Sequence, residues 1–129
     1  MHNTVLVKES KGFVDGARLL EELDRESFPV AAAFWHRMPE YDTERLIIVS
    51  PEADEGNLGA YMRVQKALRA LLGSSLPLSD ILVMGVQSER FRELRRKIEG
   101  VLGFVPPDQR PHLEGYVSED TAIYRWLAS

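Results

Sequence analysis

The chain contains no cysteine, which excludes disulfides, thiolate metal sites and thiol nucleophiles. Its apolar runs are short: PVAAAFW, residues 29–35, is far below the roughly 20 residues that a membrane-spanning helix needs. The opening MHNTVLVKES has no basic segment followed by an apolar one, so a secretion signal is not expected. Together these absences predict a cytoplasmic protein with no membrane segment.

Sequence motifs for common cofactors and catalytic groups are also absent. Neither G-x-G-x-x-G nor G-x-x-x-x-G-K occurs, which excludes the usual phosphate-binding fingerprints. The three histidines include no pair at a metal-ligand spacing such as H-x-x-x-H. No catalytic residue, cofactor or metal is therefore predicted, and the sequence favours a non-enzymatic role.

The composition that remains is typical of one soluble globular domain. The 129 residues are 44% hydrophobic and 28% charged, and a chain of this length buries roughly two-thirds of its unfolded surface. The formal net charge is -4, so acidic side chains outnumber basic ones. We expect a single domain over residues 1–129 with one hydrophobic core.

Hydrophobic spacing near the start predicts a strand and then a helix. TVLV, residues 4–7, is a short β-branched run that ends in a turn. Residues 13–25 have the periodicity of an amphipathic helix, and Pro29 disfavours its continuation. The residues expected toward the core are Phe13, Ala17, Leu20 and Leu23, with Asp15 on another face.

The central segments predict a hairpin, a helix and a strand. Residues 30–38 and 45–50 are apolar runs on either side of the polar PEYDTE, so they should pair as antiparallel interior strands. A helix is expected from Asn57, as its cap, to Leu72, followed by a strand over residues 80–86. The buried residues of this helix are expected to include Leu58, Met62, Leu68 and Leu72.

The last predicted helix runs from a Ser88 cap to Gly100. Up to residue 87 the order is βαββαβ, which is the ferredoxin-like arrangement, with two helices over one face of the sheet. The predicted fold class is α+β, with an antiparallel or mixed sheet and three main helices. Residues 88–129 add the last helix, a proline-rich connector and a closing segment.

The closing segment, residues 118–128, has two interpretations. Ser118 with Glu119 and Asp120 can begin a helix. Alternatively, GYV and TAIYRWL can form a β-hairpin that turns at Glu119 and Asp120, and their aromatic and β-branched content favours strands. We predict the hairpin.

Several stretches together resemble a family of small, uncharacterised bacterial proteins. They are FVDGARLLEELDRESFPVAAAFW, RLIIVSP, AYMRVQKALRAL, LSDILV and GYVSEDTAIYR. The resemblance covers most of the chain and implies a bacterial cytosolic domain, but no activity, cofactor or substrate. It also implies an extended closing segment, which supports the hairpin.

The basic stretch SERFRELRRKIEG, residues 88–100, raises the question of nucleic-acid binding. Its cations alternate with acidic residues at helical pairing distance, which is typical of a solvated helix face. Phosphate binding needs several cations on one surface, so the two basic rows must lie side by side. The candidate contacts are Arg63, Lys66, Arg69, Arg92, Arg95 and Arg96.

Two weaker candidates involve polar loops. His36 and Arg37 end a strand beside a loop with Glu40, Asp42 and Glu44, a combination that general-base chemistry can use. The PEADEG loop has carboxylates that suit a hard cation, but it lacks the register of a calcium loop. Its carboxylates are Glu52, Asp54 and Glu55.

The function favoured by the sequence is a non-catalytic protein-interaction or self-association module. The tail is rich in residue types that concentrate binding energy at interfaces, and a hairpin at a sheet edge can pair with another strand. The expected partner is a second copy or another protein. The candidate interface residues are Tyr116, Tyr124, Arg125 and Trp126.

Overall fold

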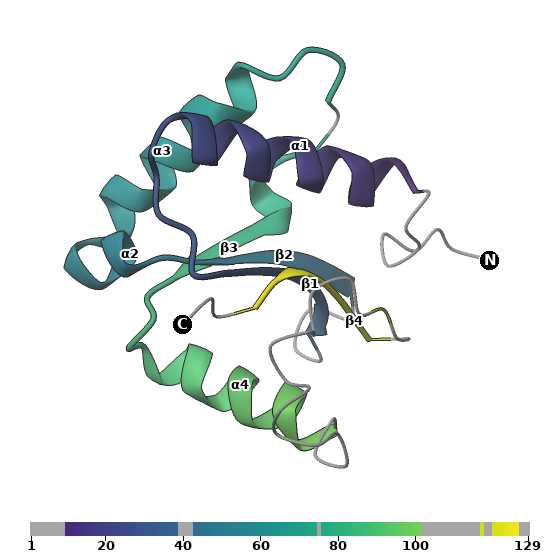
Figure 1. Cartoon of the computed structure of the whole chain (residues 1–129), viewed down its shortest axis with the longest axis vertical. Helices are drawn as coiled ribbons and strands as arrows, with labels where there is room; N and C mark the ends of the chain where they lie inside the picture. Colours follow the sequence, from purple (N-terminus) through teal and green to yellow (C-terminus); the bar gives the residue numbers. More distant parts are fainter. Residues whose placement is uncertain (1–9, 39–42, 75, 102–116, 118–119, 127–129) are drawn as a thin grey trace.

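The computed structural model describes residues 10–38, 43–74, 76–101, 117 and 120–126. Figure 1 shows the arrangement of the elements. In chain order they are α1 (Lys11–Arg25), β1 (Ala32–Met38), β2 (Thr43–Val49), α2 (Pro51–Glu55), α3 (Asn57–Arg69), the 3-10 turn η1 (Leu78–Asp80), β3 (Ile81–Met84), α4 (Glu89–Val101) and β4 (Thr121–Arg125).

The four strands form one mixed sheet in the order β3-β2-β1-β4. β1 is antiparallel to both of its neighbours, β2 and β4, whereas β2 and β3 are parallel. Phe34 of β1 lies opposite Ile47 on one side and Ile123 on the other. The predicted antiparallel pairing of the two central runs and the α+β class with a mixed sheet are confirmed.

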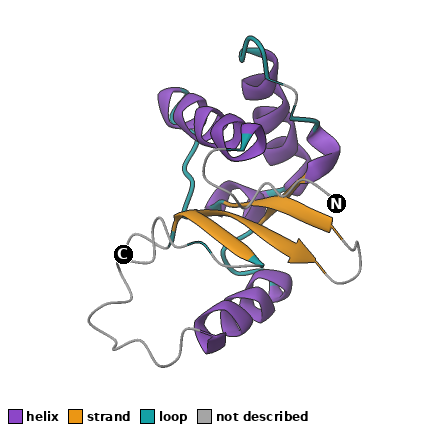
Figure 2. Ribbon diagram, turned by 90° about the vertical axis from the view of Figure 1, so that its right-hand side faces the viewer, coloured by secondary structure: helices purple, strands orange, loops and turns teal. Residues whose placement is uncertain are grey.

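Helices cover both faces of the sheet. α1 and α3 lie over one face and α4 lies over the other, as both views show (Figures 1 and 2). The first face packs Leu19, Leu23 and Val64 against Trp35 and Leu46 of the strands. The second face packs Phe91, Leu94 and Ile98 against Phe34, Ile47 and Ile123. Because β1 and β2 are covered on both faces, each contains an uninterrupted apolar run, residues 32–35 in β1 and residues 46–49 in β2.

The ferredoxin-like order is not confirmed. The two helices of the predicted unit, α1 and α3, do cover one face, but a ferredoxin-like sheet is antiparallel, whereas here β2 and β3 are parallel and the strand order is β3-β2-β1-β4. The predicted strand over residues 4–7 lies outside the described residues. The fourth strand of the described sheet, β4, comes instead from the closing segment.

Serine caps begin α1 and α4, whereas α3 follows Gly56 without a side-chain cap, so the predicted Asn57 cap was wrong. The Ser10 hydroxyl oxygen accepts the backbone N–H of Phe13 at 3.1 Å at the start of α1. The Ser88 hydroxyl oxygen accepts the N–H of Phe91 at 3.2 Å, which confirms the predicted cap of α4. Each bond satisfies a donor that the first helical turn leaves without a partner.

The predicted inward face of α3 was wrong for Leu58, Met62 and Leu72, whereas Leu68 is half-buried and packs on the core as predicted. Leu58 and Met62 are 75% and 61% exposed, and Leu72, beyond the end of the helix, is 85% exposed. The buried side chains of α3 are Ala60, Val64 and Ala67, which share the same helical spacing but point to the opposite side. Small side chains at these positions let α3 approach the sheet and α1 closely.

The closing segment contains a strand, as the hairpin interpretation required. Residues 121–125 pair with β1, and Val117 forms an isolated antiparallel bridge with Ala122. The rest of the predicted first hairpin strand lies outside the described residues. Within the described part of the chain, no helix is long and apolar enough to cross a membrane.

Candidate functional site

Tyr124, a predicted interface residue, is held inside the domain. Its ring packs on Phe13 with 4.4 Å between ring centroids. Its hydroxyl accepts the Trp35 Nε1–H at 2.9 Å and donates to the carbonyl oxygen of Phe13. Burial raises the pKa of the Tyr124 phenol well above its usual value; the Trp35 hydrogen bond opposes this shift and the negative charge of Asp15 adds to it. Tyr124 therefore ties β4 to α1 and β1.

Trp126 and Arg125 also make contacts within the domain. Trp126 is 5% exposed, lies edge-on to Phe34 and donates its Nε1–H to Glu99 at 3.3 Å. The Arg125 guanidinium binds both carboxylate oxygens of Asp24, at 2.8 and 3.1 Å. These side chains fasten β4 to α1 and α4, and Tyr116 lies outside the described residues.

The two basic rows do not meet. α3 carries Arg63, Lys66 and Arg69 on one side of the sheet, and α4 carries its cations on the other (Figure 1). Arg63 donates to the Glu26 carbonyl oxygen at 3.0 Å and lies 5.2 Å from the centroid of the Phe28 ring. On α4, Arg95 pairs with Glu99 at 3.1 Å, while Arg92 and Arg96 are exposed. A single phosphate-binding patch that spans both helices is therefore not formed.

Of the described residues in the predicted group, His36 lies apart from Arg37 and Glu44. His36 Nδ1 is 2.8 Å from Thr121 Oγ1. Arg37 follows it on the strand, so its side chain leaves the opposite face, where it pairs with Glu44 at 2.8 Å. Glu40 and Asp42 lie outside the described residues.

The PEADEG segment folds into α2 rather than an open loop. Ser50 caps it by accepting the N–H of Glu52 at 3.1 Å. The Asp54 carboxylate accepts the backbone N–H groups of Val86 and Gln87, at 2.9 and 3.1 Å. Among the described residues, no group of three His, Cys, Asp or Glu could hold a metal ion. Asp54 thus orients the β3–α4 loop.

An open cavity of about 370 Å³ lies beside this loop. Tyr61 and Asn57 of α3 cover the outer edge of β3 here: the Tyr61 hydroxyl accepts the Val83 N–H at 2.9 Å, and the Asn57 amide reaches the Val83 carbonyl at 3.5 Å. Sequence reasoning missed this site because its walls come from four separate segments. The polar residues that line it are Asp54, Asn57, Tyr61, Ser88 and Arg90.

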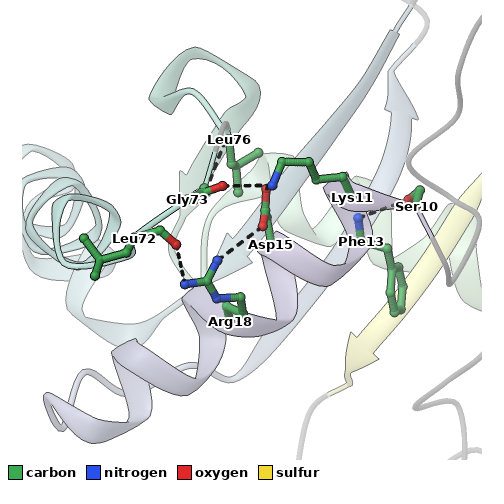
Figure 3. Close-up of polar contacts among 9 residues, drawn as sticks. Ser10, Lys11, Phe13, Asp15, Arg18, Leu72, Gly73 and Leu76 are labelled. Atoms are coloured by element: carbon green, nitrogen blue, oxygen red, sulfur yellow. Dashed lines mark hydrogen bonds and ion pairs between the residues drawn. The ribbon is translucent and has the colours of Figure 1, made fainter.

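A buried carboxylate on α1 holds the loop that follows α3 (Figure 3). Asp15 is 2% exposed, contrary to its predicted outward position, and lies 3.5 Å from Lys11 Nζ and 3.6 Å from Arg18 Nη1. The same two cations donate to the carbonyl oxygens of Gly73 and Leu72, at 2.8 and 2.7 Å. Burial of Asp15 is compensated by these charges, and the loop backbone is fixed against α1.

The outward surface of α3 carries exposed apolar side chains. In the part of the chain that the structure describes, the large apolar residues that are exposed are Val14, Leu58, Met62, Leu72 and Val117. Leu58 and Met62 are one helical turn apart, and Lys66 and Arg69 continue the same side toward the end of α3. We call Leu58, Met62, Lys66 and Arg69 the α3 outer face.

Comparison with known proteins gives no relative from which a function could be transferred. No protein-family model, no curated protein and no solved structure matches this chain.

Proposed function

We propose that this protein is a non-catalytic module that associates with a second copy of itself through the α3 outer face. The observation that supports the proposal is the exposure of Leu58 and Met62, 75% and 61%, on the side of α3 opposite its buried stripe. A helix on a protein surface normally presents polar residues there. Two neighbouring apolar side chains beside cations suit a contact that buries them.

The charges around α3 suit an antiparallel pairing with a second copy. Glu55 comes just before the helix begins, and Lys66 and Arg69 lie in its last turn. Within the described residues, none of these three side chains forms an ion pair, and all three are exposed. A twofold axis that crosses near Met62 would bring the acidic end of one α3 to the basic end of the other.

Three of the residues predicted to form an interface make contacts within the domain. Tyr124 bonds Trp35, Arg125 binds Asp24 and Trp126 donates to Glu99, so we propose a contact surface elsewhere. At the β3 edge of the sheet, Tyr61 and Asn57 occupy the Val83 backbone groups. Occupied backbone groups disfavour strand addition at the β3 edge, and a helix face is the contact surface that we propose.

Light scattering after gel filtration tests the proposal. At high protein concentration we expect a mass of twice the 14.7 kDa of the chain, falling toward 14.7 kDa on dilution. Leu58→Ser combined with Met62→Ser should give the monomer mass at every concentration. Val14→Ser, which removes an exposed apolar side chain from α1, is the matched control and should leave the mass unchanged. A monomer at all concentrations would refute the proposal.

A further inference from the structure

The cavity at the end of β3 has a distinctive position in the topology. β2 and β3 are parallel neighbours, and their carboxyl ends lie side by side. The chain leaves β2 toward α2 and α3 on one face, and it leaves β3 toward α4 on the other (Figure 2). When neighbouring parallel strands send their connections to opposite faces, the loops separate and leave a crevice, which is where open α/β sheets bind ligands.

The walls of this crevice offer hydrogen-bond donors. The Tyr61 hydroxyl accepts the Val83 N–H, and none of the described residues takes its proton. The Asn57 amide makes one long contact, 3.5 Å, to the Val83 carbonyl and has a further N–H to donate. Arg90, on the first turn of α4, adds a positive charge to the lining. Hydrogen-bond donors from α3 and a guanidinium from α4 suit a ligand that carries acceptor oxygens.

The floor of the crevice is fixed in place. Both Asp54 oxygens accept backbone N–H groups of the β3–α4 loop, which fixes the loop and offsets part of the carboxylate charge. A β-carbon on Gly85 would lie 2.0 Å from Asp54 Oδ1, so only glycine leaves room for this contact. Ala53 and Met84 add apolar surface. A cavity of about 370 Å³ has the size of a small-molecule site.

We infer that this crevice binds a small organic oxyanion, a carboxylate or phosphate group on a compact apolar body. Arg90 binds the charged group, and Tyr61 and Asn57 donate hydrogen bonds to its oxygens. The apolar body lies against Ala53 and Met84. This site is separate from the α3 outer face and does not depend on self-association.

An NMR titration of the ¹⁵N-labelled full chain tests the inference. The probes are inorganic phosphate, phenyl phosphate and benzoate. We expect saturable shifts in the amide signals of residues 57–61 and 85–90, with phenyl phosphate or benzoate binding more tightly than inorganic phosphate. Arg90→Gln should weaken the tighter probe about tenfold, because a charge-assisted hydrogen bond is lost. Arg92→Gln, the exposed neighbour on α4, should bind as the parent does.

Tyr61→Phe supplies a second test, because it removes only the hydroxyl. Affinity should fall about threefold to tenfold while the spectrum remains that of a folded protein. Benzoate and phenyl phosphate distinguish a carboxylate from a phosphate ligand. The inference is overturned if all three probes give shifts that grow linearly without saturation. It is equally overturned if Arg90→Gln and Arg92→Gln weaken binding by the same factor.

Discussion

The hydroxyl of Tyr124 lies directly against the backbone of Gly16. A β-carbon at Gly16 would stand 2.3 Å from Tyr124 Oη and 3.2 Å from Trp35 Nε1. Strand β4 and helix α1, far apart in the sequence, therefore meet at a point where only glycine fits.

Gly16→Ala should lower the free energy of unfolding by about 1–3 kcal/mol, because the added methyl group must displace a buried side chain. Gly59→Ala is the matched control, since Gly59 is also in a helix and a β-carbon there meets nothing within 4 Å. Helix propensity predicts a gain of about 0.5–1 kcal/mol for this control. Urea denaturation measures both. Equal stability of the parent and Gly16→Ala would contradict the close contact.

Tyr124→Phe should cost about 1–3 kcal/mol at neutral pH, because the buried Trp35 Nε1–H loses its acceptor. Trp35 is 1% exposed, so water cannot replace the lost partner without rearrangement. Tyr61→Phe is a useful comparison, since its hydroxyl bonds a backbone N–H at a more open position. Fluorescence-detected unfolding in urea is the measurement. A loss below about 0.3 kcal/mol for Tyr124→Phe would contradict this role.

The raised pKa of Tyr124 predicts an alkaline dependence of stability. The folded phenol keeps its proton above pH 10, where the unfolded phenol, with a usual pKa of about 10, begins to ionise. The stabilisation is therefore complete below pH 10 and is lost as the pH rises further. The difference in unfolding free energy between the parent and Tyr124→Phe should shrink by up to about 1.4 kcal/mol per pH unit. A difference that is constant from pH 9 to 11.5 would contradict the shift.

Asp54→Asn should loosen the β3–α4 loop. The two Asp54 oxygens accept the N–H groups of Val86 and Gln87. An asparagine side chain has only one acceptor oxygen, and its NH₂ group would face the other N–H donor, so one of these two hydrogen bonds is lost. We expect amide hydrogen exchange at these two residues to accelerate about tenfold, with about 1–2 kcal/mol lost in stability. Glu93→Gln, a similar change at an exposed residue of α4, should leave both unchanged. Equal exchange rates in the two variants would contradict the role of Asp54.

Asp15→Asn should release the loop that follows α3. The neutral side chain no longer balances the positive charges of Lys11 and Arg18. These two side chains donate hydrogen bonds to the carbonyl oxygens of Gly73 and Leu72. We expect a loss of about 1–2 kcal/mol, moderated by the partial exposure of both cations. Limited proteolysis near residue 72 should become faster. Glu21→Gln, on the exposed side of α1, is the control, and identical cleavage rates in the two variants would contradict the prediction.

The four strands of the described sheet and the approximate extents of α1, α3 and α4 could be predicted because they depend on local properties, whereas α2 was expected to be a loop. β1 and β2 are apolar enough to indicate burial on both faces, and Ser88 followed by an amphipathic stretch marks the start of a helix. The inward side of α3 could not be predicted in this way. Leu58 with Met62, and Ala60 with Val64, have the same helical spacing, and hydrophobicity alone favours the larger pair. Close packing on α1 and the sheet selects the smaller one.

The candidate sites depend on contacts between distant segments. Asp15 was expected at the surface because it is charged. It is buried because Lys11 and Arg18 balance its charge, and the same cations bind carbonyl oxygens of the distant loop after α3. The crevice joins α2, α3, the end of β3 and the start of α4, and no motif within any one of them indicates it. The position of α4 on the second face likewise separates two basic rows that the sequence alone allows to be adjacent.

The central claim is that α3 pairs with α3 of a second copy in an antiparallel orientation, and a charge exchange tests it most directly. Glu55→Lys alone and Arg69→Glu alone should each weaken the dimer, because each places like charges opposite one another. The two changes together restore opposite charges across the twofold axis, so sedimentation equilibrium should show the double variant to associate nearly as tightly as the parent. If the double variant loses as much association free energy as the two single variants together, the proposed interface is wrong. It is also wrong if neither single change alters the association.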